Sequence, residues 1–435
     1  MSKVKIIKIA KKIKKAINLT AGAEFTPYVC PARRVDFVKT TERVCAMTFD
    51  DGPTKLTLQN ENVSLTEALI NILNKHNAKG TFDVIGTTEN NYPDIEGKLS
   101  TPSWSGVKFD HYPCFNKDTM AGTENCPDII KKIIDSGHQI TNHTYSHVLY
   151  GKKNIIYSKR HHYKTYNEAK DDLLKLDRLL LDKHGYKMTF SRPPHYVDKM
   201  ADGLNVYDMY SETGYGYLGA SFDGAGWLPC ETYEKEIDAM VLPLKKALEI
   251  NPDALCGQII FQKDGFNMAL RAPVVDGLDK QLNLLDKYGY KVITVNELIE
   301  RFPFSDVGNN DEDFELFKNV SKKYNIVYTD NTVRPDKIMT RGELAMMICP
   351  KNIAVNERIS LILNKKKKVG ICPTKHPYST AYNYMIEKGY FSANDGFLPN
   401  AHVTFADLKL LKNTFDTTKL SKDKLTRRNV FKSIK

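Results

Sequence analysis

The chain has 435 residues, 41% hydrophobic and 26% charged, an ordinary globular composition that predicts more than one domain at about 150 residues per domain. Its 63 basic and 52 acidic residues leave a net charge of +11, which favours anionic partners such as cell-wall polymers or membrane faces. The sequence has no apolar run near the roughly 20 residues that span a bilayer, no nucleic-acid motif and no Cys-x-x-Cys pair typical of a zinc ribbon.

Residues 1–39 form a basic N-terminal segment for which two interpretations stay open. Isoleucines recur at helical spacing between Ile6 and Ile17, as in a cationic amphipathic helix at a membrane surface. Ala21-Gly22-Ala23 resembles a signal-peptidase site, although lysines interrupt any apolar stretch before it. A solvated basic tail is the simple alternative to both, and the expected location is the cell envelope or the secreted fraction.

The middle of the chain alternates strand-like apolar runs with amphipathic helical stretches. Strands separated by helices predict a parallel sheet with right-handed crossovers, either an open sheet or a closed barrel. We predict strands at 44–49, 80–86, 138–142, 187–191, 215–222, 257–262 and 290–295. The predicted helices are 64–77, 127–136, 165–184, 231–249 and 274–288.

Residues 87–126 are predicted to be a functional loop inserted after the second strand. The stretch is rich in Asn, Pro, Gly, Ser and Thr, lacks strong periodicity and is longer than an ordinary connection between a strand and a helix. Its aromatic side chains either pack the loop onto the barrel, which is the more common role, or stack on sugar rings. They are Trp104, Phe109, Tyr112 and Phe115.

Two polar motifs follow the ends of predicted strands. Asp50 and Asp51 close the first strand, and His143 and His147 follow the strand at 138–142. Imidazoles four residues apart fall on one face of a helical turn and can share a metal ion. One aspartate would supply a third ligand and leave the other free, with an open position for water, as in catalytic metal sites.

Each motif alone has a simpler explanation. A His-x-x-x-His pair is more often two solvated histidines, and Asp-Asp-Gly-Pro is more often a turn. Their shared place at the carboxyl ends of strands, where α/β folds build their sites, favours a hydrolase.

The motifs resemble those of the polysaccharide deacetylase family, also called the NodB-homology family. Thr48–Pro53 matches the family's first motif, His143–His147 matches its second and Ser191–Pro194 resembles its third. The resemblance implies a distorted (β/α) barrel of about seven parallel strands in residues 40–302, with the site at the carboxyl ends of the strands.

The same resemblance implies the removal of N-acetyl groups from a polysaccharide such as peptidoglycan or a chitin-like glycan. Asp51, His143 and His147 would bind a divalent metal, with zinc as first choice and cobalt, nickel or manganese also admitted. The metal would hold the attacking water and lower its pKa. Asp50 would be the general base, kept ionised by the charge of Arg192.

The later motifs depart from the family's pattern. His195 and Tyr196 follow Pro194, where the family continues with an aromatic residue and Gly. In the fourth motif, Asp223 and Trp227 are present, but the second acid is lost. Pro194, Tyr196, Asp223 and Trp227 are assigned to substrate binding.

The fifth motif of the family contains a His that protonates the leaving amine, and Lys263 stands in its place. Lys263 and His195 are therefore both candidates for the general acid. Two functions stay open: an N-deacetylase, or a catalytically impaired carbohydrate- or cell-wall-binding protein that keeps the metal site.

Residues 303–420 resemble S-layer homology repeats. Thr340-Arg341-Gly342-Glu343 is close to that family's Thr-Arg-Ala-Glu signature, a second copy has Phe405 in place of the Arg, and a third is not recognised. Such repeats attach proteins to anionic cell-wall polymers, and the planar donors of Arg341 would suit an acidic sugar substituent. A purely structural helical appendage is the alternative. Residues 421–435 are predicted to be a basic tail.

Overall fold

The computed structural model describes residues 32–57, 62–87, 120–151, 162–200, 204–267, 269, 271–363, 371–373, 376–420 and 425–435. The predictions for residues 1–31, for residues 88–119 of the inserted loop and for its four aromatic residues lie outside these ranges. The chain divides into two compact units. Of the described residues, the first contains those within Val35–Val206 and Tyr215–Phe302, and the second contains residues 32–34 and those within Tyr207–Gly214 and Pro303–Lys435.

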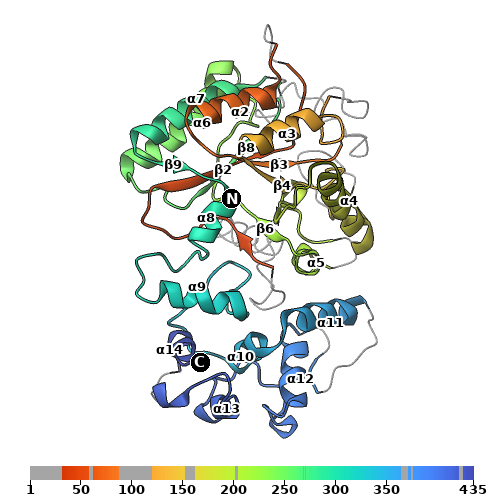
Figure 1. The fold of residues 1–435 in the computed structure, drawn as a ribbon, viewed down its shortest axis with the longest axis vertical. Helices are drawn as coiled ribbons and strands as arrows, with labels where there is room; N and C mark the ends of the chain where they lie inside the picture. The colour runs from red at the N-terminus through yellow and green to blue at the C-terminus, as the bar shows by residue number, and fades with distance from the viewer. Residues whose placement is uncertain are drawn as a thin grey trace, which may run out of the picture. The chain divides into compact units, whose positions relative to one another are not determined.

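A parallel sheet forms the centre of the first unit (Figure 1). Its strand order is β1-β6-β5-β4-β3-β2-β8-β7, and β9 pairs with β2 outside this path. The central β2 is buried along its whole length and pairs in parallel with β3, β8 and β9. The strands are β1 (Arg34–Val35), β2 (Val44–Asp50), β3 (Thr81–Val84), β4 (Gln139–Asn142), β5 (Phe190–Ser191), β6 (Gly216–Leu218), β7 (Phe222–Asp223), β8 (Ile259–Lys263) and β9 (Lys291–Val292).

The sheet curls, as the link between β6 and β7 shows. These strands follow one another in the chain but lie towards opposite ends of the strand order. The link from Leu218 to Phe222 can span about 14 Å at most when fully extended, so the two ends of the sheet must approach each other. The curled sheet confirms the predicted distorted (β/α) barrel. The single strand predicted at 215–222 is wrong, because the chain turns at 219–221 to cross between the two ends.

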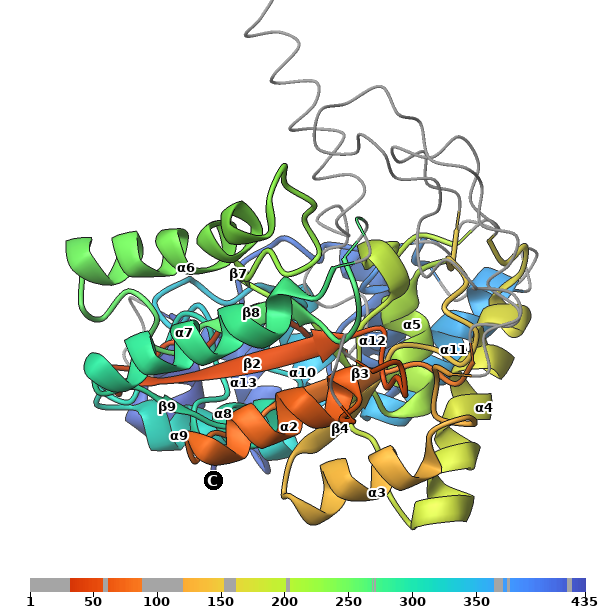
Figure 2. The same ribbon diagram turned by 90° about the horizontal axis from the view of Figure 1, so that it is seen from above.

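Amphipathic helices cover the sheet, and their ends follow from local capping. Ser64 and Thr165 each accept a hydrogen bond from the backbone three residues on, while Glu67 and Glu168 reach back in return. Helices α2, α7 and α6 lie side by side next to β2 and β8 (Figure 2). The helices of the first unit are α2 (Leu65–Lys75), α3 (Pro127–Asp135), α4 (Tyr166–His184), α6 (Tyr233–Ile250), α7 (Pro273–Lys287) and α8 (Val295–Arg301). Helix α5 (Val206–Thr213) falls almost wholly within Tyr207–Gly214, which belongs to the second unit. Helices α5 and α8 were not among the predictions.

The second unit is helical, and three of its helices begin at a threonine. Thr340, Thr404 and Thr426 each accept a backbone hydrogen bond from the residue three positions on, at the start of α10, α13 and α14. The unit therefore contains a third threonine-capped helix that was not recognised in the sequence. Its main helices are α9 (Phe314–Lys323), α10 (Arg341–Ile348), α11 (Lys351–Leu363), α12 (Ser379–Glu387), α13 (Phe405–Leu410) and α14 (Arg427–Lys432).

The predicted basic tail is instead folded where the structure describes it. Arg427 in α14 is fully buried, because its guanidinium donates to the carbonyl of Val333 at 2.7 Å and lies 3.6 Å from the carboxylate of Glu343. Val430 and Phe431 of the same helix are also buried. The paired side chain of Arg427 and the apolar face of α14 are therefore buried within the second unit. Among the residues described, no helix combines the length and apolarity that a membrane span needs.

Candidate metal centre

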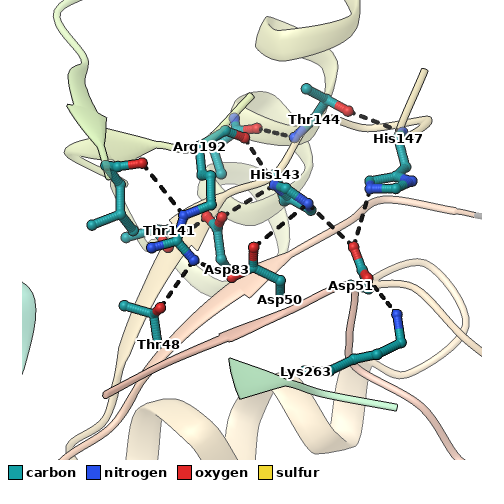
Figure 3. A network of polar contacts seen from close by, with 12 residues as sticks. Thr48, Asp50, Asp51, Asp83, Thr141, His143, Thr144, His147, Arg192 and Lys263 are labelled. Atoms are coloured by element: carbon teal, nitrogen blue, oxygen red, sulfur yellow. Dashed lines mark hydrogen bonds and ion pairs between the residues drawn. The ribbon is translucent and has the colours of Figure 1, made fainter. Parts of the chain in front are cut away.

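The carboxyl ends of β2 and β4 bring the two polar motifs together. Both strands pair in parallel with β3, so they end at the same edge of the sheet. One oxygen of Asp51, Oδ1, lies 3.2 Å from Nε2 of His143 and 3.0 Å from Nε2 of His147 (Figure 3). The His143 and His147 rings are buried, with 3% and 2% of their side chains exposed, and the Asp51 side chain is 13% exposed.

The two histidines lie in an irregular loop, so the prediction of a shared helical turn is wrong. Thr144 and His147 have left-handed backbone angles, with φ of 71° and 53°. Side chains of the motif stabilise this shape, because Asn142 Oδ1 accepts the N–H of Thr144 at 2.8 Å and Thr144 Oγ1 accepts that of His147 at 2.9 Å. The resulting turn places the two rings 4.8 Å apart.

Asp172, which the sequence analysis missed, holds this loop from α4. Its carboxylate accepts the N–H groups of Tyr145 and Ser146 at 2.9 and 3.2 Å and the hydroxyl of Ser146 at 2.7 Å. The signal for it was an acidic residue on the buried face of a helix, beside Ala169 and Leu173. Buried acids need such partners, so its position indicated a role in supporting a neighbouring segment.

Lys263 pairs with the other oxygen of Asp51. It ends β8 opposite Asp50 in the pairing with β2, and its ammonium forms an ion pair with Oδ2 of Asp51. Burial alone would raise the pKa of Asp51, but the charge of Lys263, the charge of His147 and the hydrogen bonds from both histidines hold it well below its ordinary value. Asp51 is therefore ionised, with Oδ1 facing the histidines and Oδ2 facing Lys263.

Asp50 is a separate buried carboxylate beside these groups. Its Oδ1 is paired with Arg192, whose guanidinium also donates to Thr48 Oγ1 at 2.9 Å and to the carbonyl of Gly219 at 2.7 Å. Burial raises the pKa of Asp50 to about 7, against the opposing charges of Arg192 and His143. Its Oδ2 lies 3.9 Å from Nε2 of His143. A carboxylate that titrates near neutrality at this place can exchange a proton with a reacting group.

Asp83 is a further buried acid that the sequence analysis did not assign to the site. It lies in β3 between β2 and β4, and its Oδ2 is 3.1 Å from Nδ1 of His143. Its Oδ1 accepts a hydrogen bond from Thr141 at 2.7 Å. The sequence signal for this role was an aspartate in the interior of a predicted apolar strand, at 80–86, where an acidic side chain is unusual.

The remaining predicted residues lie at the third and fourth motifs. The ring of His195 is 5.6 Å from that of His147, and His195 and Tyr196 both have positive φ, of 52° and 55°. Asp223 at the end of β7 accepts hydrogen bonds from the indole of Trp227, both at 3.1 Å. Neither Asp223 nor Trp227 belongs to the group of metal-type donor atoms.

The donor set of Asp51, His143 and His147 fits a divalent metal. Their donor atoms all lie within 4.8 Å of one another. In a tetrahedral zinc site with bonds of about 2.0–2.1 Å, neighbouring donors are roughly 3.3 Å apart, which is close to the 3.0 and 3.2 Å seen here. Two imidazoles and one carboxylate leave room for a further ligand, as open metal sites require.

Curated relatives are similar to part of the chain. PgdA, a peptidoglycan-N-acetylglucosamine deacetylase of Listeria monocytogenes serotype 1/2a (strain 10403S), is 24% identical over 296 residues, which cover 68% of this chain and 45% of that protein. A peptidoglycan-N-acetylglucosamine deacetylase of Bacillus cereus is 28% identical over 150 residues, covering 34% of this chain and 35% of the relative. The chain thus spans about half or less of the length of these two relatives.

Solved structures and a family model give further matches. The Bc1960 peptidoglycan N-acetylglucosamine deacetylase has 22% identity and a TM-score of 0.41, over 61% of this chain and 92% of that one. A CE4 family pseudoenzyme from Bacillus anthracis has 17% identity and a TM-score of 0.40, over 62% and 69%. Residues 37–205 match the family model described as polysaccharide deacetylase. The matched residues carry the Asp-Asp and His-x-x-x-His motifs, so this part of the first unit is similar to that family.

Proposed function

We propose that the first unit hydrolyses N-acetyl groups of a glycan such as peptidoglycan or a chitin-like polymer, with a divalent metal, zinc as first choice. One observation carries this proposal: Asp51, His143 and His147 converge on one point while a second buried carboxylate, Asp50, stands beside them with its own counter-charge. The names of the similar Listeria and Bacillus proteins support the substrate class.

In the proposed reaction, Asp51, His143 and His147 would hold the metal, which when bound supplies Lewis-acid polarisation and an acidified water. Arg192 occupies Oδ1 of Asp50, so Oδ2 is the atom placed to accept a proton from the attacking water. The water oxygen bonds to the acetamide carbon, the carbon–nitrogen bond breaks, and the amine leaves with a proton. The products are acetate and a free amino sugar.

The first test is metal-dependent acetate release by the purified chain. We expect release from peptidoglycan or chitooligosaccharides, its loss after treatment with a chelator and its return with added zinc or cobalt. Acetate is measured enzymatically, and glycan binding is measured in parallel by co-sedimentation. Glycan binding without acetate release, in a sample shown to contain the metal, would favour the alternative of a catalytically impaired carbohydrate-binding protein.

The proton for the leaving amine is assigned to Lys263. Its ammonium already contacts Asp51 at the site, and the residue is 7% exposed. We expect Lys263→Met, which keeps the aliphatic stem, to lower kcat by about 10²–10⁴-fold, and His195→Ala to have a milder effect. Zinc content is measured in each variant to separate loss of the metal from loss of the acid. Small and equal effects on kcat would remove Lys263 from this role.

The second unit is proposed to attach the protein to an anionic cell-wall polymer. The observation that favours this function is Arg341, whose guanidinium lies 4.2 Å from the ring of Phe391 and 5.9 Å from that of Tyr382. One terminal nitrogen of the guanidinium is paired with Asp395 and Asp407 at 3.3 and 3.5 Å, whereas its buried Nε has no hydrogen-bond acceptor within the described part of the chain. Aromatic rings beside an incompletely paired guanidinium suit a sugar that carries an acidic group.

We expect the full chain to sediment with purified cell walls at low salt and to be released as the salt concentration rises, because charge pairing at a surface is screened. Arg341→Met should weaken sedimentation, whereas the matched variant Arg334→Met, at a partly exposed arginine of the same unit, should not. Thermal melting checks that both variants are folded. Absence of sedimentation by the wild-type protein at low salt would leave the second unit as a structural appendage.

A further inference from the structure

The far side of the His143 ring is enclosed by two oxygen atoms. Nδ1 lies 2.8 Å from the carbonyl oxygen of Arg192 and 3.1 Å from Oδ2 of Asp83 (Figure 3). A backbone carbonyl can only accept a hydrogen bond, so Nδ1 must carry a proton in this arrangement. Nε2, on the opposite side of the ring, is then the nitrogen that faces Asp51.

Asp83 occupies a position where a carboxylate is costly. It is fully buried in β3, with Asp50 opposite it on β2 and Thr141 opposite it on β4. An apolar side chain would fill a central strand at lower cost, because a buried carboxylate loses its hydration. Thr141 provides a hydrogen bond to Oδ1, and this contact orients Oδ2 towards the imidazole.

Two other roles for Asp83 are excluded by its surroundings. A cation held by Asp50, Asp83 and His143 would face the guanidinium of Arg192, which already pairs with Asp50. A role as the reacting base is excluded because Asp83 lies behind the His143 ring, on the side away from Asp51, and has no exposed surface.

We propose that Asp83 is a positioning residue that makes His143 a stronger metal ligand. Its negative charge beside Nδ1 keeps the proton on that nitrogen, fixes the orientation of the ring and increases electron donation from Nε2. It also offsets part of the positive charge that Arg192 and a bound metal bring to the buried site. The inference rests on the metal site of the proposed function, and it adds a residue of β3 to the groups that support that site.

The test compares zinc affinity in full-length variants, by titration against a chelating dye. Asp83→Asn keeps the size of the side chain and removes the charge, and we expect it to bind zinc about 10–100-fold more weakly than the wild type. The matched control is Asp177→Asn in α4, a carboxylate of the first unit that accepts a hydrogen bond from Tyr215 at 2.7 Å. That control should leave zinc affinity unchanged.

Thermal melting without metal separates positioning from packing. A folded Asp83→Asn variant with wild-type zinc affinity would overturn the proposal, even if its melting temperature fell. If Asp83→Asn does not fold, Thr141→Val takes its place, because it keeps the Asp83 carboxylate and removes the hydroxyl that orients it at 2.7 Å. Thr141→Val should weaken zinc binding, and unchanged affinity there would equally overturn the proposal. The zinc titration uses no glycan, so its result does not depend on deacetylase activity. A wild-type protein that binds zinc but releases no acetate from glycans would contradict the proposed function and leave this inference standing.

Discussion

Asp50→Asn is expected to lower kcat for deacetylation by about 10²–10⁴-fold while zinc affinity stays near that of the wild type. The reason is that the two neighbouring aspartates have different contacts. Asp51 faces both histidines, whereas Asp50 is paired with Arg192 through Oδ1, which leaves Oδ2 to accept the proton of the attacking water. Asparagine retains the shape of the side chain but cannot accept that proton. Acetate release and zinc titration on the same preparation provide the measurement.

The matched comparison is Asp51→Asn, one residue along the chain. This variant should lose zinc affinity and activity together, because the substitution removes an anionic ligand. A variant of Asp50 that loses zinc as completely as the variant of Asp51 would show that both aspartates are ligands. Full activity in Asp50→Asn would exclude it as the base.

Arg192→Met is expected to reduce the free energy of unfolding by about 3–5 kcal/mol at pH 8, the cost of leaving a buried charge without its partner. Asp50 and Arg192 are both buried. In the variant, the carboxylate of Asp50 would remain buried beside that of Asp83, with no guanidinium to balance its charge. Urea denaturation of the metal-free protein, monitored by circular dichroism, gives the value.

The loss of unfolding free energy in Arg192→Met should be smaller at low pH. The pKa of Asp50 in the folded protein is about 7, above the ordinary value of 3.8, so protonation favours the folded state. Stability from this group is therefore present below pH 3.8 and declines as the pH rises through the folded pKa. Without Arg192 that folded pKa rises further, so the destabilisation of the variant should grow between pH 6 and pH 8. The double variant Asp50→Asn, Arg192→Met should recover part of the loss, and a double variant as unstable as Arg192→Met alone would contradict this explanation.

Elements with strong local signals were predictable from the sequence. The helix predicted at 165–184 is α4, because a capping box at Thr165 and Glu168 starts it and Gly185, in a left-handed conformation, follows its last residue. The apolar run that ends at Asp50 is β2. Since the carboxyl ends of parallel strands share one edge, the sequence could also indicate that the aspartates and histidines would meet.

The local shape of the histidine loop was not predictable from residue spacing. A separation of four residues suits a helical turn, but Asn142 and Thr144 provide side-chain hydrogen bonds to the backbone and stabilise left-handed residues instead. Asp172 adds bonds to the same loop from a helix that begins about twenty residues later in the chain. These competing bonds arise only when α4 packs against the end of β4.

The sequence by itself determined the alternation of strands and helices around the motifs, the two motifs and the donor types, because these depend on periodicity and residue chemistry along the chain. It did not predict α5 and α8 or the division of 215–222 into β6 and β7. Only the tertiary structure decided which strands are neighbours. The pairing of β8 with β2 puts Lys263 against Asp51, and the place of β3 between β2 and β4 puts Asp83 behind His143. Contacts between strands far apart in sequence depend on sheet order and register, and a single sequence carries no local signal for either.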